Sequence, residues 1–258
     1  MFRAGYATDI LDFIRFEKTV VTSLIGIFGY VLFNPLGAGI LFAALSSFCA
    51  IAVSRAYNNL KDKEEDIVNR KKINRLTEKR TGLLVILFIF IVGLFSSLYL
   101  PPISTFFYLL TIIVVIIYSA LRLKSYFLVK NIVSGIFLTA VFLMGTGFLS
   151  AEVGVYYLMI FLFIYTGSLI SDLMDYGGDR AAGLRTIPVV LGIGRTKRLV
   201  YALFLLFTLI TFQLRLFNLF ILALASIMAI LFIMANKEAY VHKLGGFSVA
   251  LTIIIMLI

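Results

Sequence analysis

Residues 82–121 read GLLVILFIFIVGLFSSLYLPPISTFFYLLTIIVVIIYSAL and contain no charged side chain. Pro101-Pro102 divides the stretch into two apolar runs, 82–100 and 103–121. Each run approaches the roughly 20 apolar residues that a helix needs to cross a hydrocarbon layer about 30 Å thick. Because proline disfavours continuation of a helix, we expect two membrane-spanning helices joined by a very short turn.

The rest of the chain has the same character. Of its 258 residues, 62% are hydrophobic and 14% are charged, whereas soluble domains are about 45–50% apolar and about 25% charged. We therefore predict an all-α, polytopic membrane protein with a single domain over residues 1–258, built as a nine-transmembrane-helix bundle. The spans are expected near 19–33, 37–54, 82–100, 103–121, 129–149, 153–171, 199–214, 217–235 and 244–258.

Charge divides unevenly between the two sides of these nine spans. All Lys and Arg residues except Arg215, and all Asp and Glu residues except Glu152, fall on the side of the N-terminus. By the positive-inside rule this side is cytoplasmic and the C-terminus is external, which predicts a multi-pass protein of the cell membrane. The formal net charge of +10 is then a matter of topology and does not indicate a nucleic-acid partner. Acidic residues do little to orient a membrane protein, so their presence there points to chemistry.

Two acidic rows follow helix ends on that side. Asn58, Asp62 and Asp66 are spaced i, i+4, i+8, and Asp172, Asp175 and Asp179 are spaced i, i+3, i+7, so each set lies on one face of a continuing helix. The chain has one Cys and one His, which excludes Cys- and His-based metal sites. Oxygen ligands alone favour Mg²⁺, with phosphate oxygens completing its coordination. We expect the rows to face each other across two ions and a diphosphate.

The pairing of these rows suggests an internal duplication, with units at 1–121 and 122–235 and a final helix at 240–258. Gly177-Gly178 is expected to let the second row leave its helix. Cations follow both rows and complement a diphosphate. They are Arg70, Lys71, Lys72 and Arg75 after the first, Arg122 and Lys124 in the next loop on that side, and Arg180 and Arg185 after the second.

At these residues the sequence resembles the UbiA superfamily of intramembrane prenyltransferases. That family carries an N-D-x-x-D-x-x-x-D motif after its second helix and a D-x-x-D-x-x-x-D motif after its sixth. The first motif is present from Asn58 to Asp66, with Asn59 where the family usually has Asp, and the second is complete. The continuation from Gly183 to Pro188 is similar to the family's G-x-[KR]-T-x-P ending.

The resemblance implies a nine-helix, Mg²⁺-dependent transferase with a lipid-open cavity capped by cytoplasmic loops, in which a polyprenyl diphosphate and a lipid or aromatic acceptor react. The implied catalytic residues are Asp62, Asp66, Asp175, Asp179 and Arg70. The implied metal residues are Asn58, Asp62, Asp66, Asp172, Asp175 and Asp179, with Asp172 in a supporting role. The implied diphosphate contacts are Arg15, Lys18, Arg70, Tyr118, Arg122, Lys124 and Arg185.

Within the family, the second motif is similar to that of archaeal digeranylgeranylglyceryl phosphate synthases and also to that of the menaquinone, tocopherol and chlorophyll branches. Of these we expect geranylgeranyl transfer to geranylgeranylglyceryl phosphate in archaeal ether lipid synthesis. Prenylation of an aromatic quinone precursor is the alternative acceptor chemistry. A cation or phosphate transporter is the alternative outside enzymes, but the acidic residues lie at one membrane face, whereas a transport path needs polar groups near mid-depth.

Overall fold

The computed structural model describes residues 4–61, 74–78, 80–121 and 126–258, and every regular element within these ranges is a helix. The long helices are α2 (Phe16–Phe33), α3 (Gly39–Lys61), α5 (Arg80–Leu98), α6 (Pro102–Ala120), α7 (Val129–Thr146), α8 (Ala151–Ala181), α10 (Ile193–Gln213), α11 (Phe220–Met234) and α12 (Glu238–Leu257). The short elements are α1 (Ala4–Phe13), α9 (Ile187–Leu191) and the 3-10 turns η1 (Arg75–Glu78) and η3 (Phe217–Leu219). The all-helical prediction is confirmed for this part of the chain.

Within the described ranges, eight helices are long and apolar enough to cross a membrane. α10, with 21 residues, is not among them, and its first two turns carry Arg195, Lys197 and Arg198. The stretch at 82–121 forms α5 and α6 as expected. Pro102 occupies the first turn of α6, where its missing N–H leaves no hydrogen bond unmade.

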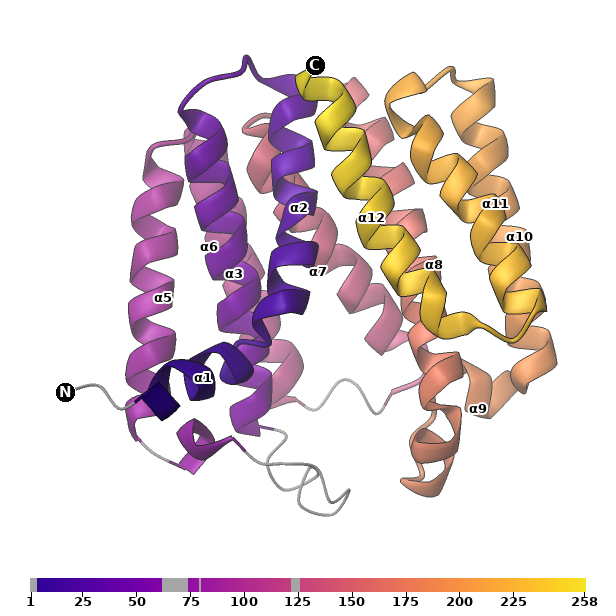
Figure 1. Ribbon diagram of the computed structural model, residues 1–258, viewed down its shortest axis with the longest axis horizontal. Coiled ribbons are helices and arrows are strands. Elements are labelled where there is room, and N and C mark those ends of the chain that lie inside the picture. The colour runs from indigo at the N-terminus through magenta and orange to yellow at the C-terminus, as the bar shows by residue number, and fades with distance from the viewer. Residues whose placement is uncertain (1–3, 62–73, 79, 122–125) are drawn as a thin grey trace.

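The long helices stand side by side in a bundle (Figure 1). α2 packs against α3, α7 and α12, and α7 also packs against α6 and α8, so α2 and α7 lie at its centre. Gly26, Gly29 and Gly145 let these two helices approach closely. A Cβ atom at Gly145 would lie 1.9 Å from the carbonyl oxygen of Gly26, a contact that only glycine permits. The internal duplication stays a prediction.

One end of the bundle carries α1, the last turns of α3 and α8, and α9, and we call it the motif end; the C-terminus lies at the other (Figure 1). α1 was not expected from the sequence. It lies across the motif end because Phe13 and Ile14 are buried in a cluster with Ala52, Ala56 and Leu76. The amide of Asn74 donates to the backbone oxygen of Asp9 (2.7 Å), which ties η1 to α1.

α8 is the longest helix, with 31 residues. At 1.5 Å per residue it is about 46 Å long, well beyond the roughly 30 Å hydrocarbon layer. Its last turns hold the second acidic row at the motif end. The expectation that Gly177-Gly178 ends this helix is wrong, because α8 continues through both residues to Ala181. The chain turns instead at Gly183, whose φ of +69° suits glycine.

Candidate functional site

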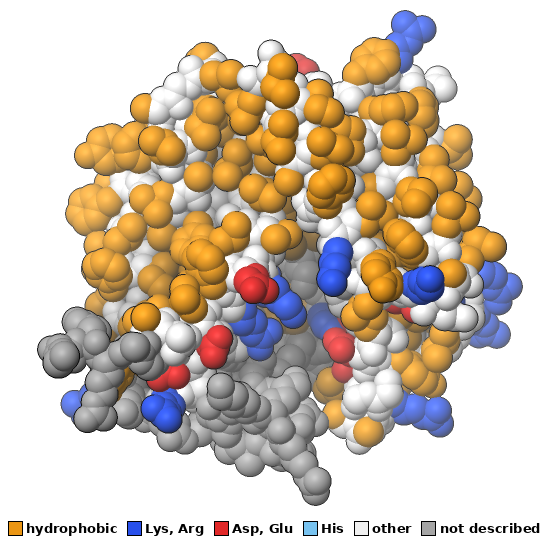
Figure 2. Space-filling view, in the orientation of Figure 1, with side chains coloured by type: hydrophobic (Ala, Val, Ile, Leu, Met, Phe, Trp, Pro, Cys, Tyr) orange, Lys and Arg blue, Asp and Glu red, His pale blue; other side chains and the backbone are white. Residues whose placement is uncertain are grey.

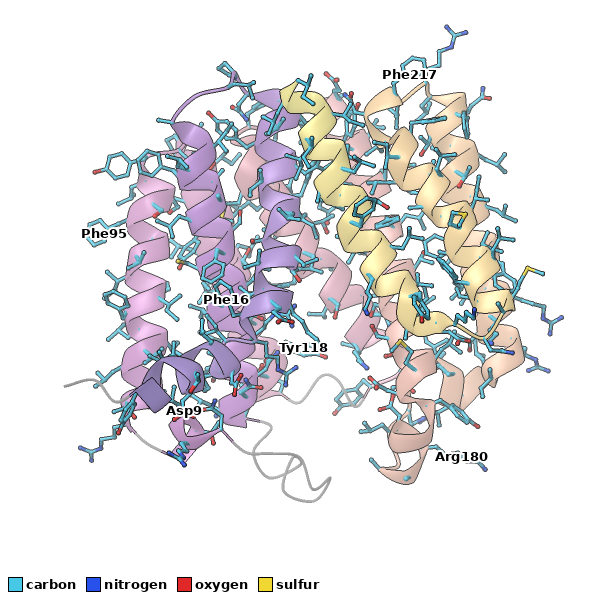
Figure 3. The ribbon with its side chains drawn as sticks, in the orientation of Figure 1. Asp9, Phe16, Phe95, Tyr118, Arg180 and Phe217 are labelled. Carbon is cyan, nitrogen blue, oxygen red and sulfur yellow. The ribbon has the colours of Figure 1, made fainter. Side chains whose placement is uncertain are left out.

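The described site residues gather at the motif end. Figure 3 shows Tyr118 and Arg180 at this end and Phe217 at the opposite one. In Figure 2, charged side chains gather in the lower half of the face around a recess, whereas the upper half is mostly hydrophobic. Seven predicted residues lie outside the described residues, and they are Asp62, Asp66, Arg70, Lys71, Lys72, Arg122 and Lys124.

A cavity of about 220 Å³ opens among α2, α3, α6 and α7 near the motif end. Two predicted residues, Asn58 and Tyr118, line it. Its other polar lining residues are Thr22, Ser54, Arg55 and Ser134. The apolar lining consists of Ile51, Val114, Val115, Val133, Phe137 and Leu138. The cavity therefore combines a hydrophobic wall with polar groups beside the first motif.

Asn58, the first residue of the first motif, is half-buried in the last turns of α3. The hydroxyl of Ser119 on α6 donates a hydrogen bond to Asn58 Oδ1. Because Tyr118 precedes Ser119, this bond fixes the start of the first motif next to the tyrosine that lines the cavity. The Tyr118-Ser119 pair thus positions the motif through α6.

Asn59, the departure from the family pattern, is directed away from the cavity. Its Oδ1 accepts a hydrogen bond from Arg15 Nη2 (2.8 Å), and its Nδ2 donates to the backbone oxygen of Phe13 (2.6 Å). An amide does both, whereas a carboxylate only accepts. Arg15, between α1 and α2, has a φ of 50°, an uncommon conformation for a residue with a side chain. Asn59 therefore holds the corner between α1 and α2.

Asp172, the first carboxylate of the second motif, is fully buried, with 0% of its surface exposed. Its Oδ1 lies 2.5 Å from Lys130 Nζ, and its Oδ2 accepts from Asn131 Nδ2 at 2.9 Å. The same amide also contacts Ser168 Oγ at 2.9 Å. Both carboxylate oxygens are therefore engaged by the first turn of α7.

The carboxylates of Asp175 and Asp179 are more accessible than that of Asp172. Asp175 is exposed and Asp179 is half-buried. Asp179 Oδ2 is buried and has no hydrogen-bond partner in the described part of the chain, and the same holds for the hydroxyl of Thr186. A buried carboxylate oxygen without a partner is costly unless a cation meets it. Its chemistry fits a hard metal ion such as Mg²⁺.

The residues that the structure describes do not by themselves complete a metal site. Among them, no group of three or more Asp, Glu, His or Cys side chains converges on one point. Asp175 and Asp179 supply two carboxylates. Mg²⁺ commonly takes one or two carboxylates and completes its octahedron with water and phosphate oxygens, so this number fits one ion bound with a diphosphate.

The predicted cations of the described part lie on the rim. Arg15, Lys18 and Arg185 are exposed, and none of them lines the cavity. Arg15 is held by Asn59. Among the described residues, the structure thus separates these exposed rim cations from Arg55, the arginine that lines the cavity.

Arg55 and Lys130 are the residues that the sequence analysis missed. The predicted span 37–54 stops one residue before Arg55, whereas α3 continues to Lys61. A charge one helical turn before Asn58 was a usable signal, since ionisable residues inside membrane helices are generally functional. Lys130 was counted as a loop cation, and nothing in the sequence pairs it with Asp172, 42 positions away.

Known proteins are similar to this chain in sequence and in fold. The model of the UbiA prenyltransferase family matches residues 19–243. A digeranylgeranylglyceryl phosphate synthase of Methanocaldococcus jannaschii is 26% identical over 242 residues, covering 87% of this chain and 83% of that protein. One from Haloquadratum walsbyi is 26% identical over 199 residues, covering 73% and 69%. A UbiA homologue from Archaeoglobus fulgidus, solved with GPP and Mg²⁺, superimposes with a TM-score of 0.76 at 16% identity, covering 97% of this chain and all of that one.

Proposed function

Because this chain belongs to the UbiA prenyltransferase family, and is thereby a multi-pass membrane prenyltransferase, we propose that it transfers a geranylgeranyl group from geranylgeranyl diphosphate to geranylgeranylglyceryl phosphate. The two relatives named digeranylgeranylglyceryl phosphate synthases support this acceptor. The family relationship also favours the enzyme over the transporter alternative.

The observation that best supports the proposal is that the first turns of α7 lie next to both motifs. Lys130 and Asn131 bind Asp172 of the second motif, while Val133 and Ser134 line the cavity that Asn58 of the first motif borders. Both motif helices therefore meet α7 at the same end of the bundle. A diphosphate placed beside Asn58 is within the same polar region as the second acidic row.

In this proposal, two Mg²⁺ ions are held by Asn58, Asp62, Asp66, Asp175 and Asp179, and Asp172 supports them through its bonds to α7. When bound, the ions neutralise the charge that develops on the leaving diphosphate. The side chains proposed to contact the diphosphate are Arg15, Lys18, Arg70, Tyr118, Arg122, Lys124 and Arg185.

The chemistry then follows from charge and exclusion of water. The allylic C–O bond breaks, and its electron pair leaves with the diphosphate. The acceptor hydroxyl oxygen forms the new bond to the prenyl carbon and gives up its proton to the released diphosphate. The apolar cavity wall, which includes Val133, Phe137 and Leu138, keeps water from capturing the allylic cation.

The orientation is also proposed. With α10 as the ninth span, the N-terminus and both motifs lie on the cytoplasmic side and the C-terminus lies outside, because Arg215 is the one basic residue of the opposite side. A charged prenyl diphosphate on the cytoplasmic side then reaches the motif end without crossing the hydrocarbon layer.

The test uses the full-length protein in lipid nanodiscs with radiolabelled geranylgeranyl diphosphate. Geranylgeranylglyceryl phosphate and a hydroxybenzoate are supplied separately, with Mg²⁺ or with EDTA. We expect a labelled ether lipid only with Mg²⁺ and the glycerol phosphate acceptor. Transfer to the aromatic acceptor alone would replace the proposed acceptor, and the absence of transfer to either would contradict the proposed reaction.

A further inference from the structure

We propose that Arg55 binds the anionic group of a substrate inside the cavity among α2, α3, α6 and α7. This is a binding role for a residue that lies outside both acidic motifs. Arg55 is on α3, three residues before Asn58, and therefore about 4.5 Å deeper along the helix axis. It lines the same cavity as Asn58 and Tyr118.

The guanidinium of Arg55 is only partly engaged by the protein. Its Nη2 donates to the hydroxyl of Thr22 (2.9 Å) and, at 3.4 Å, to the backbone oxygen of Lys18. Its Nε is buried and has no hydrogen-bond partner among the described residues. A guanidinium has five N–H donors in a fixed fork, so donors remain for a ligand.

The charge of Arg55 is also uncompensated. No carboxylate of the described residues lies within salt-bridge distance of it, and the like charge of Arg15 acts on it unfavourably. A buried cation without a counter-ion is destabilising, and inside a membrane helix the penalty grows. An anion in the cavity removes this penalty.

The dimensions of the cavity indicate which part of a substrate it holds. Sites for whole drug-sized ligands are about 300–1,000 Å³, and this cavity of about 220 Å³ is smaller. Thr22, Ser54, Asn58 and Ser134 add hydroxyl and amide groups around Arg55. The cavity therefore suits a phosphate, diphosphate or carboxylate head group, with the lipid chain lying elsewhere.

Two substrates can supply such a group: the diphosphate of the prenyl donor and the acidic head of the acceptor. The chemistry that Arg55 recognises is the same in both. Assigning the anion to a substrate rests on the proposed function, whereas the anion site itself rests on Arg55 and the cavity alone.

The experiment measures binding without turnover, on the full-length protein in nanodiscs. Pyrophosphate, geranylgeranyl diphosphate and geranylgeranylglyceryl phosphate are titrated separately into wild type, Arg55→Gln and Arg195→Gln. Arg195 is an exposed arginine on α10, so its variant controls for the loss of one positive charge. A hydrogen bond to a charged group corresponds to about 10–100-fold in affinity, and we expect Arg55→Gln to weaken at least one ligand by that factor.

Each outcome decides the proposal. Weaker binding of pyrophosphate and the donor assigns the anion to the donor, and weaker binding of the acceptor alone assigns it to the acceptor. Unchanged affinity for all three ligands overturns the proposal and leaves Arg55 as a clamp between α2 and α3. A wild type that binds pyrophosphate through Arg55 but makes no product overturns the proposed function alone.

Two further variants separate binding from folding. Thr22→Val removes the clamp bond and one cavity hydroxyl but keeps the guanidinium, so we expect a lower thermal midpoint and a smaller loss of ligand affinity than in Arg55→Gln. If Arg55→Gln does not fold, Arg55→Lys tests whether the guanidinium binds the anion, because lysine keeps the positive charge but lacks the planar fork of N–H donors. We expect a loss of about 3–10-fold for the same ligand, and unchanged affinities for all three would again overturn the proposal.

Discussion

Lys130 and Asp172 form an ion pair of 2.5 Å that joins the first turn of α7 to the second acidic motif on α8. Asp172 is fully buried, whereas the Lys130 side chain is 26% exposed. Asn131 satisfies the other carboxylate oxygen. The pair therefore fixes how the second motif sits relative to the cavity wall on α7.

Replacing Asp172 by Asn is expected to loosen this junction. It leaves the Lys130 ammonium without its partner, which corresponds to a loss of about 1.5–3 kcal/mol of stability. We expect a lower thermal midpoint and at least about a tenfold loss of turnover, because the other motif carboxylates shift from their working positions. Lys130→Met in the same background is expected to recover part of the thermal midpoint. Additive effects of the two substitutions would contradict a direct pair.

Replacing Asn59 by Asp restores the usual family residue, yet the structure predicts a loss. The carboxylate keeps the bond to Arg15 but faces the backbone oxygen of Phe13 without a hydrogen to donate. We expect a decrease of about 1 kcal/mol in stability, seen as a lower thermal midpoint, with an unchanged Mg²⁺ requirement. A lower Mg²⁺ concentration for half-maximal activity in this variant would show that the side chain reaches the metal site.

Replacing Asp179 by Asn tests its unpartnered buried oxygen. An amide is a weaker Mg²⁺ ligand than a carboxylate, so we expect the Mg²⁺ concentration for half-maximal activity to rise about tenfold or more. The control is Asp12→Asn, an exposed carboxylate on α1 at the same end of the bundle. Equal Mg²⁺ dependence of the two variants would argue against a metal role for Asp179.

Replacing Gly145 by Ala tests the close contact between α2 and α7. The new Cβ atom would lie 1.9 Å from the carbonyl oxygen of Gly26, so the helices must separate, and overpacking of this kind typically destabilises by about 1–3 kcal/mol. Gly154→Ala is the matched control, because no atom lies within 4 Å of its added Cβ. We expect the thermal midpoint to fall only in Gly145→Ala, and equal midpoints would contradict the packing.

The sequence predicted the long helices well where apolar runs were bounded by charge or proline, as at 82–121. α3 continues past the predicted span to Lys61, as the spacing of the first acidic row requires. The expected end of the second row's helix at Gly177-Gly178 is wrong, because α8 continues through both glycines to Ala181. Composition reports where lipid contact ends, whereas hydrogen bonding along the backbone continues the helix into the polar region.

The candidate site was predictable in its residue types but not in its pairings. The spacing of Asp172 from Asp175 and Asp179 assigns this residue to a motif. Its contacts with Lys130 and Asn131 depend instead on how α7 packs against α8. The role of Asn59 depends on the position of α1, a helix of ten residues that shows no long apolar run. Long-range contacts of this kind are set by packing, which one sequence does not display.

In the proposed site, both acidic motifs hold one diphosphate through Mg²⁺. The most direct test measures the affinity for geranylgeranyl diphosphate with Mg²⁺ in Asp62→Ala, Asp175→Ala and the double variant, using the full-length protein in nanodiscs. We predict that either single substitution weakens binding strongly and that the double variant is barely weaker, because the two residues serve the same ligand. Unchanged affinity in Asp175→Ala, or losses that simply add, would contradict a shared site.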